Sequence, residues 1–249
     1  MKIKNVLKYF GIGLVILILL TVAGLYIWSA TGTYPAGEIA AAALESSESV
    51  RVSQEKWIVF TPESVTDIGL IFYPGGLVEP EAYAPVLHQI AEQGVLVIIT
   101  PMPLNLAIFS TNQADAVMQA YPQISTWVLA GHSLGGAAAG IYAENNSQKI
   151  AGLAFWDSYP PDSSDLSDNA LPVISIYGTT NGIANTDNFD EKIDLLPSDT
   201  LFVPIEGASH AQFGDYGPQT GDVTPSISAK EQHELVAAFM IDFIKQLPK

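Results

Sequence analysis

The clearest chemical signal in the sequence is a serine within the hexapeptide GHSLGG at residues 131–136. An apolar run ends just before it at Ala130, and an alanine-rich, helix-forming segment begins near Gly135. A sharp strand-to-helix turn of this kind holds a serine hydroxyl clear of the sheet, and it needs glycine on both sides because larger residues would clash with neighbouring backbone. The hydroxyl would also lie at the positive end of the helix. We therefore predict that Ser133 is a nucleophile, the alternative being a glycine-rich turn with a capping serine.

A nucleophilic serine needs a base, and the chain has four histidines. His210 follows an apolar run that ends at Ile205, and it comes after Ser133 in the chain, as this type of site requires. We predict that His210 takes the proton of Ser133 and returns it to the leaving group. The others lie inside the turn or on predicted helices: His132, His88 and His233. They lack the close spacing of metal ligands and the chain has no cysteine, so we expect neither a metal site nor a cofactor.

Acyl transfer also needs hydrogen-bond donors for the negative oxygen that develops in the transition state. The backbone N–H of Leu134, the residue after the nucleophile, is one expected donor. The second is expected from the loop that follows the apolar run Ile68–Tyr73, where Gly75 and Gly76 permit close backbone approach. Gly76 or Leu77 would then supply the second N–H, unless this loop is only a Pro-Gly turn.

Three stretches together resemble the α/β-hydrolase superfamily: YPGG at residues 73–76, GHSLGG at residues 131–136 and IEGASHAQFG at residues 205–214. More narrowly, the chain is similar to the bacterial α/β-hydrolase fold-5 group, whose members are often membrane-associated or secreted hydrolases. The resemblance covers roughly residues 50–249. It implies an α/β-hydrolase fold with a triad of serine, acid and histidine.

The third member of that triad is ambiguous in this chain. The superfamily usually places a carboxylate in a Gly-Thr-x-Asp-Gly segment, but residues 178–182 read GTTNG and put Asn181 at that position. An asparagine can orient the histidine but carries no charge. Asp157 follows the preceding apolar run and could reach His210 from one strand over, although an aspartate there also suits a turn cap. Asp187 or another acid is the third possibility, and the sequence leaves all of these open.

The N-terminus predicts a membrane anchor. No charged residue occurs between Phe10 and Trp28, a stretch long enough as a helix to cross a hydrocarbon core of roughly 30 Å. The lysines of the first segment all precede it, and the next basic residue is Arg51. The positive-inside rule therefore predicts a cytoplasmic N-terminus and an exported remainder. A cleaved signal peptide is the alternative, but no small-x-small cleavage site follows Trp28.

Apolar runs alternate with helical segments from about residue 68 to the end, which predicts an α/β architecture with a mostly parallel sheet. We expect a cytoplasmic tail at residues 1–9, the anchor at 10–28, a linker and short helix at 29–49 and a hydrolase domain at 50–249. A loop at residues 211–228 is expected to border the pocket with Phe213 and Tyr216.

Charge and motifs together predict a class of reaction. The net charge is −16, so the chain should repel nucleic acid, and we expect its partners to be a small-molecule ester and the membrane. Two-step cleavage of a carboxylic ester or thioester through an acyl-enzyme on Ser133 is the main hypothesis. An inactive, membrane-anchored binding protein is the alternative, because Asn181 occupies the usual acid position. A transferase or peptidase with the same triad is a third hypothesis.

Overall fold

The computed structural model describes residues 3–64, 67–183 and 192–248, and the chain divides into two units, Met1–Thr33 and Tyr34–Lys249. The first unit is one helix, α1 (Ile3–Gly32). Its segment Tyr9–Gly32 has a mean hydropathy of 2.6 and is long and apolar enough to cross a membrane, as an anchor or a signal sequence would be.

The first residues of the linker expected within residues 29–49 are helical instead. The helix α1 continues through Gly32, since residues 29–31 include neither proline nor glycine. The next residues belong to the second unit, in which the Tyr34 N–H donates to the Leu77 carbonyl at 2.8 Å. The compact unit therefore begins about sixteen residues earlier than the predicted boundary at residue 50.

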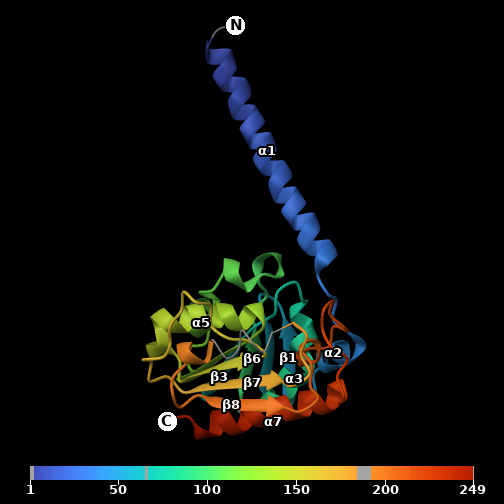
Figure 1. Ribbon diagram of the computed structural model, residues 1–249, viewed down its shortest axis with the longest axis vertical. Coiled ribbons are helices and arrows are strands. Elements are labelled where there is room, and N and C mark those ends of the chain that lie inside the picture. The colour runs from blue at the N-terminus through green and yellow to red at the C-terminus, as the bar shows by residue number, and fades with distance from the viewer. Residues whose placement is uncertain (1–2, 65–66, 184–191, 249) are drawn as a thin grey trace. The chain divides into compact units, whose positions relative to one another are not determined.

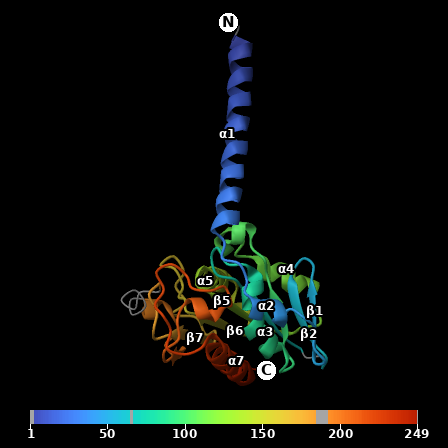
Figure 2. The same cartoon turned by 90° about the vertical axis from the view of Figure 1, so that its right-hand side faces the viewer.

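The second unit is built on one eight-stranded sheet with the order β1-β2-β4-β3-β5-β6-β7-β8. The two edge pairs β1·β2 and β2·β4 are antiparallel, and all pairs from β4 onwards are parallel, as predicted. The strands are β1 (Val50–Gln54), β2 (Ile58–Pro62), β3 (Ile68–Tyr73), β4 (Leu96–Ile99), β5 (Thr126–His132), β6 (Gly152–Trp156), β7 (Val173–Gly178) and β8 (Leu201–Ile205). Figure 2 shows β1 and β2 at one edge and β7 towards the other.

Helices cover both faces of this sheet, and in Figure 1 α5 and α7 lie on opposite sides of the strands. The α-helices of this unit are α2 (Glu38–Ala43), α3 (Ala84–Ala91), α4 (Gln113–Ala120), α5 (Leu134–Asn146) and α7 (Ala229–Gln246). Short 3₁₀ helices are η1 (Pro80–Tyr83), η2 (Pro103–Asn105), η3 (Ala107–Phe109), η4 (Ser147–Lys149), η5 (Ile193–Leu195) and η6 (Ala211–Phe213). The alternating pattern of the sequence also predicts a helix near residues 189–195; part of this range lies outside the described residues, and the described part contains η5.

Two apolar cores result, one on each face. On β5, Val128 and Ala130 pack in the core with α3 and α7, whereas Trp127 and Leu129 pack in the core with α4 and α5. Side chains alternate between the faces of a strand, so a strand buried on both sides must be apolar throughout. The continuous apolar runs of the sequence follow from this requirement. The parallel order also brings the carboxyl ends of β5, β6, β7 and β8 to one edge of the sheet.

Candidate active site

The turn at Ser133 joins β5 directly to α5. Its backbone has a φ of 51°, which lies in the left-handed region that residues with a Cβ seldom adopt. A Cβ at Gly135 would overlap the carbonyl oxygens of Tyr73 and Pro74, and one at Gly131 would overlap the backbone of Gly135. The two glycines therefore permit the turn, and the strain at Ser133 marks it as a candidate functional position.

His210 lies in the loop after β8, and hydrogen bonds hold the residues on both sides of it. The Gln232 side chain from α7 bonds both backbone groups of Ser209, at 3.1 and 2.9 Å. On the other side, the Ala211 N–H donates to Asp222 Oδ2 at 2.7 Å. The His210 side chain is buried, and its Nε2 has no hydrogen-bond partner among the described residues.

Asp157 follows β6 directly and also has a positive φ, 46°. The Nδ1–H of His210 donates to Asp157 Oδ2 at 2.5 Å, and the Gly178 N–H donates to Oδ1 at 3.1 Å. A carboxylate can only accept, so Nδ1 carries the proton and Nε2 of the neutral ring is left as the acceptor. This tautomer is the one a general base for a serine hydroxyl requires.

Asn181 lies against the carboxylate of Asp157. Its side-chain amide donates to Asp157 Oδ2, and its Oδ1 accepts from the Ile183 N–H at 2.8 Å. Of the three candidates for the acid, the structure thus brings Asp157 to His210 Nδ1 and puts Asn181 behind that carboxylate. Asp187 lies outside the described residues.

The donors predicted for the negative oxygen lie at the start of α5 and in the loop after β3. The Leu134 N–H opens α5 and so has no acceptor within the helix. Gly76 packs so close to Leu134 that a Cβ added to it would meet the Leu134 side chain at 3.0 Å. The Gly75 N–H is taken up by the Tyr83 hydroxyl and the Leu77 N–H by the Asn105 carbonyl. In the described part of the chain the Gly76 N–H has no acceptor, so Gly76 is the better candidate of the three.

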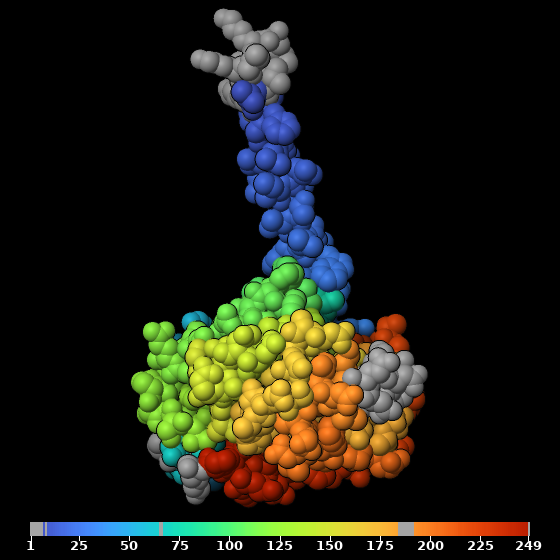
Figure 3. All heavy atoms as spheres, turned by 60° about the vertical axis from the view of Figure 1, so that its left-hand side comes forward, coloured from blue at the N-terminus to red at the C-terminus, as the bar shows by residue number. Residues whose placement is uncertain are grey.

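The side chains of Ser133 and His210 line the same cavity. It has a volume of about 260 Å³ and is lined by Ser133, Leu134, Ala137, Asp157, Ser158, Tyr159, Ile183 and His210. Hydrogen bonds also join the turn at Ser133 to the end of β6. The Ser133 N–H donates to the Trp156 carbonyl at 3.1 Å, and the Ser158 hydroxyl donates to the Ser133 carbonyl at 2.6 Å. In Figure 3 the surface segments coloured yellow to orange lie side by side on one face.

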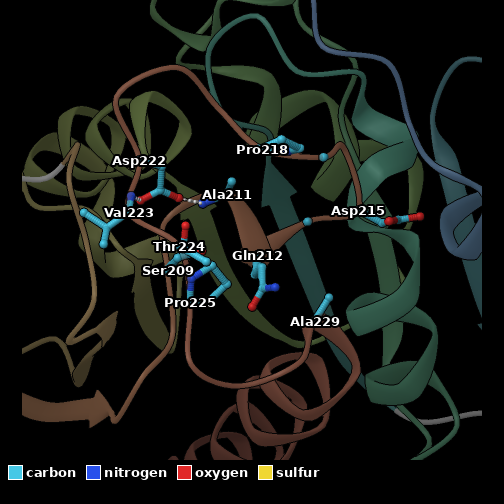
Figure 4. A pocket seen from close by; sticks show the side chains of 12 residues that line it. Ser209, Ala211, Gln212, Asp215, Pro218, Asp222, Val223, Thr224, Pro225 and Ala229 are labelled. Atoms are coloured by element: carbon cyan, nitrogen blue, oxygen red, sulfur yellow. Dashed lines mark hydrogen bonds between the residues drawn. The ribbon is translucent and has the colours of Figure 1, made fainter.

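A second cavity, of about 290 Å³, lies under the loop that follows His210 (Figure 4). Gln212 and Pro225 line it, and Figure 4 shows the Asp222 carboxylate bonded to Ala211 at its edge. Neither Ser133 nor His210 lines this cavity, so we do not assign the reaction to it.

Phe213 and Tyr216 line neither cavity, contrary to our expectation for the loop. Both are buried in the core, where Phe213 stacks on His132 at 5.5 Å between ring centroids. Their aromatic rings anchor the loop instead of bordering a pocket. Within the described residues, no three acidic or histidine side chains cluster closely enough to hold a metal ion.

A mostly parallel sheet with helices on both faces, together with the strand-to-helix turn at Ser133, is typical of one class of protein. Comparison with known proteins agrees with this class. Residues 69–234 match the model of the alpha/beta hydrolase family, which is more than half of the chain. The protein therefore belongs to the α/β-hydrolase family, and this membership supports a hydrolase. No curated protein sequence matches the chain significantly.

Solved structures of the same fold include three from bacteria. The esterase domain of a Rhodothermus marinus protein has a TM-score of 0.57 and 13% identity, over 77% of this chain and 92% of that one. Est1E from Butyrivibrio proteoclasticus has a TM-score of 0.55 and 14% identity, over 80% and 100% of the two chains. An α/β-hydrolase fold protein from Chitinophaga pinensis has 0.56 and 13%, over 82% and 99%. At identities this low, the structural likeness shows the fold alone and leaves the substrate open.

Proposed function

We propose that the protein is a serine hydrolase that cleaves carboxylic esters or thioesters through an acyl-enzyme on Ser133. The single observation that carries the proposal is the hydrogen bond from His210 Nδ1 to the Asp157 carboxylate, in a cavity that Ser133 also lines. Two of the structural relatives are described as an esterase domain and as Est1E, which is in keeping with this chemistry.

The proposed reaction has two steps. His210 Nε2 takes the proton of the Ser133 hydroxyl as the oxygen attacks the carbonyl carbon, and the same nitrogen then donates that proton to the leaving alcohol or thiol. The ester bond breaks and an acyl ester forms on Ser133. Water, deprotonated by His210, then attacks this ester and releases the acid. Leu134 and Gly76 would donate their N–H groups to the negative oxygen in both steps.

Asp157 has a distinct role in this scheme. Its carboxylate holds the Nδ1–H of His210, which fixes the ring orientation and stabilises the imidazolium that forms during each step. Asn181 and the Gly178 N–H supply further donors to the same carboxylate. The alternative of an inactive binding protein rests on a missing acid, and a carboxylate bonded to His210 speaks against it.

The cavity suggests substrates with a small acyl group. Its volume of about 260 Å³ is below the range of roughly 300–1,000 Å³ that is usual for ligand sites. We expect turnover of p-nitrophenyl esters to be highest for the shortest acyl chains and to fall as the chain lengthens. A flat profile out to long chains would contradict this limit.

The proposed nucleophile is tested by covalent labelling. A fluorophosphonate probe should modify the purified full-length protein once, at Ser133, and Ser133→Ala should abolish both the label and ester turnover. Thr126→Ala, at the opposite end of β5, is a control that should keep both. A Ser133→Ala variant that still hydrolyses esters would refute the proposal.

We further propose that α1 anchors the protein, with its N-terminus in the cytoplasm and the hydrolase unit on the other side. The length and hydropathy of Tyr9–Gly32 and the lysines that precede it support this orientation. The full-length protein should remain in the membrane fraction with its first residues intact, and added protease should reach its hydrolase unit in spheroplasts. A mature N-terminus beyond residue 28 would show that the segment is a cleaved signal.

A further inference from the structure

A short chain of hydrogen bonds joins the loop after β3 to the serine elbow. The Gly75 N–H donates to the Tyr83 hydroxyl at 3.0 Å, and this hydroxyl lies 2.8 Å from His132 Nδ1. Gly75 lies in the loop, Tyr83 ends η1 and His132 ends β5, and all three are buried. The next residue after Gly75 is Gly76 and the next after His132 is Ser133, so the chain of bonds spans the two sides of the proposed oxyanion site.

The positions of the protons in this chain follow from the environment. Burial raises the pKa of Tyr83 above its usual value of 10, so its hydroxyl keeps its proton. Burial, and secondarily the neighbouring His210, lower the pKa of His132 well below 6.5, so this ring is neutral. In the His132 tautomer that carries its proton on Nε2, Nδ1 accepts from the Tyr83 hydroxyl, whose oxygen accepts from Gly75. In this arrangement the Gly75 N–H donates, the Tyr83 hydroxyl accepts and donates, and His132 Nδ1 accepts.

The same arrangement bears on His210. The His132 and His210 rings are 4.4 Å apart between centroids. A second cation at that distance would oppose the protonation of His210 that the proposed reaction requires. A His132 that accepts the Tyr83 proton at Nδ1 must be neutral, so it places no second positive charge beside His210.

We propose that Tyr83 is a positioning residue for the oxyanion site. Its hydroxyl, by accepting from Gly75 and donating to His132, fixes the Gly76 N–H relative to Leu134 and Ser133. The inference rests on the proposed function, because an oxyanion site is meaningful only if Ser133 attacks a carbonyl. A misplaced donor costs transition-state binding more than substrate binding, because the negative oxygen exists only in the transition state.

Tyr83→Phe separates this role from simple packing. The ring lies against Phe72 at 4.8 Å between centroids, and Phe would keep that contact while losing only the hydroxyl. Removing an oxyanion donor costs about 10²–10³ in kcat, and displacing one should cost less, about tenfold. We expect Tyr83→Phe to lower kcat about tenfold, leave KM within about twofold, and weaken binding of a trifluoromethyl ketone inhibitor about tenfold.

Tyr142→Phe is the matched control. Tyr142 lies on α5, is 1% exposed and donates to Asp115 on α4 at 2.7 Å, outside the proposed site. Its loss should lower Tm as much as that of Tyr83→Phe and leave kcat and inhibitor affinity unchanged. A Tyr83→Phe variant with the inhibitor affinity of Tyr142→Phe would overturn the inference.

A second pair of variants covers the case in which Tyr83→Phe does not fold. His132→Gln keeps an acceptor for the Tyr83 proton, whereas His132→Leu does not, so the inhibitor should bind His132→Leu more weakly by about fivefold. Equal affinities in this pair would also overturn the inference. Fluorophosphonate labelling of the wild type separates the two levels: without labelling the proposed function itself fails, and with labelling only the role of Tyr83 is in question.

Discussion

The ends of β6 and β7 are neighbours in the sheet and carry similar residues with different tasks. Asp157 at the end of β6 is 3% exposed, has a φ of 46° and bonds His210. Asn181, three residues after β7, has a negative φ, is half-buried and donates to Asp157. The strained position thus holds the carboxylate that contacts the histidine, and the relaxed position holds a supporting amide.

With Asp157 as the proposed acid, the carboxylate that contacts the histidine comes from the end of β6 and not from β7. Neighbouring parallel strands lie about 4.8 Å apart, so a side chain on either strand end can reach the same histidine. The amide that stands at the usual acid position then becomes a donor to the carboxylate next door. Four predictions test this division of labour.

The largest effect is expected for Asp157→Asn. In serine proteases the same change at the triad acid lowers kcat about 10⁴-fold, because the histidine loses its correct tautomer. We expect a loss of similar size in ester turnover, with KM little changed. Full turnover in Asp157→Asn, together with its abolition in Asn181→Ala, would instead assign the orienting role to Asn181.

The exchange variant Asp157→Asn/Asn181→Asp asks whether the charge can be returned to β7. The new carboxylate would lie one hydrogen bond away from His210, behind the amide at position 157, where it can still stabilise an imidazolium. We expect turnover about 30-fold above that of Asp157→Asn alone. Activity equal to the single variant would mean that only contact with the ring is effective.

Asn181→Ala should have a smaller effect. It removes one donor from the Asp157 carboxylate and leaves Gly178 and His210 in place. A hydrogen bond to a charged group contributes about 1.5–3 kcal/mol, so we expect kcat to fall about tenfold. Asn169→Ala, which loses an amide that caps Leu171 far from the cavity, is the control and should retain full kcat.

The smallest expected effect is on the free energy of unfolding. The difference between a glycine and an alanine variant should have opposite signs at residues 157 and 181. At residue 157 a glycine should give a free energy of unfolding about 1 kcal/mol higher than an alanine, because the left-handed region costs residues with a Cβ. At residue 181 the order should reverse by about 0.5 kcal/mol, since glycine there only adds freedom to the unfolded chain. Urea unfolding of the four variants measures both differences, and the same sign at both positions would remove the distinction.

Much of the fold could be predicted from the sequence. The run Ile68–Tyr73 coincides with β3, and the pattern of a mostly parallel sheet is confirmed. Strands buried on both faces have to be continuously apolar, which makes them visible without an alignment. The start of the compact unit at Tyr34 was missed because it depends on contacts with Leu77, which no local pattern encodes.

The site was only partly visible in the sequence. The turn at Ser133 has a local sequence signature, because it requires glycines at fixed spacings. The partner of His210 was ambiguous because it depends on which of two adjacent strand ends turns its side chain inwards, and the positive φ of Asp157 leaves no mark in the sequence. Tyr83 was not singled out at all, since its bond to His132 joins residues 49 positions apart.

The account depends most on a covalent bond to one oxygen. Rapid-quench mass spectrometry of the full-length protein mixed with p-nitrophenyl acetate should show one acetyl group on the peptide that contains Ser133, formed at the rate of the p-nitrophenol burst. The adduct should be missing from Ser133→Ala and form far more slowly in His210→Ala. Turnover without any acyl adduct, or an adduct on a different residue, would contradict the central claim.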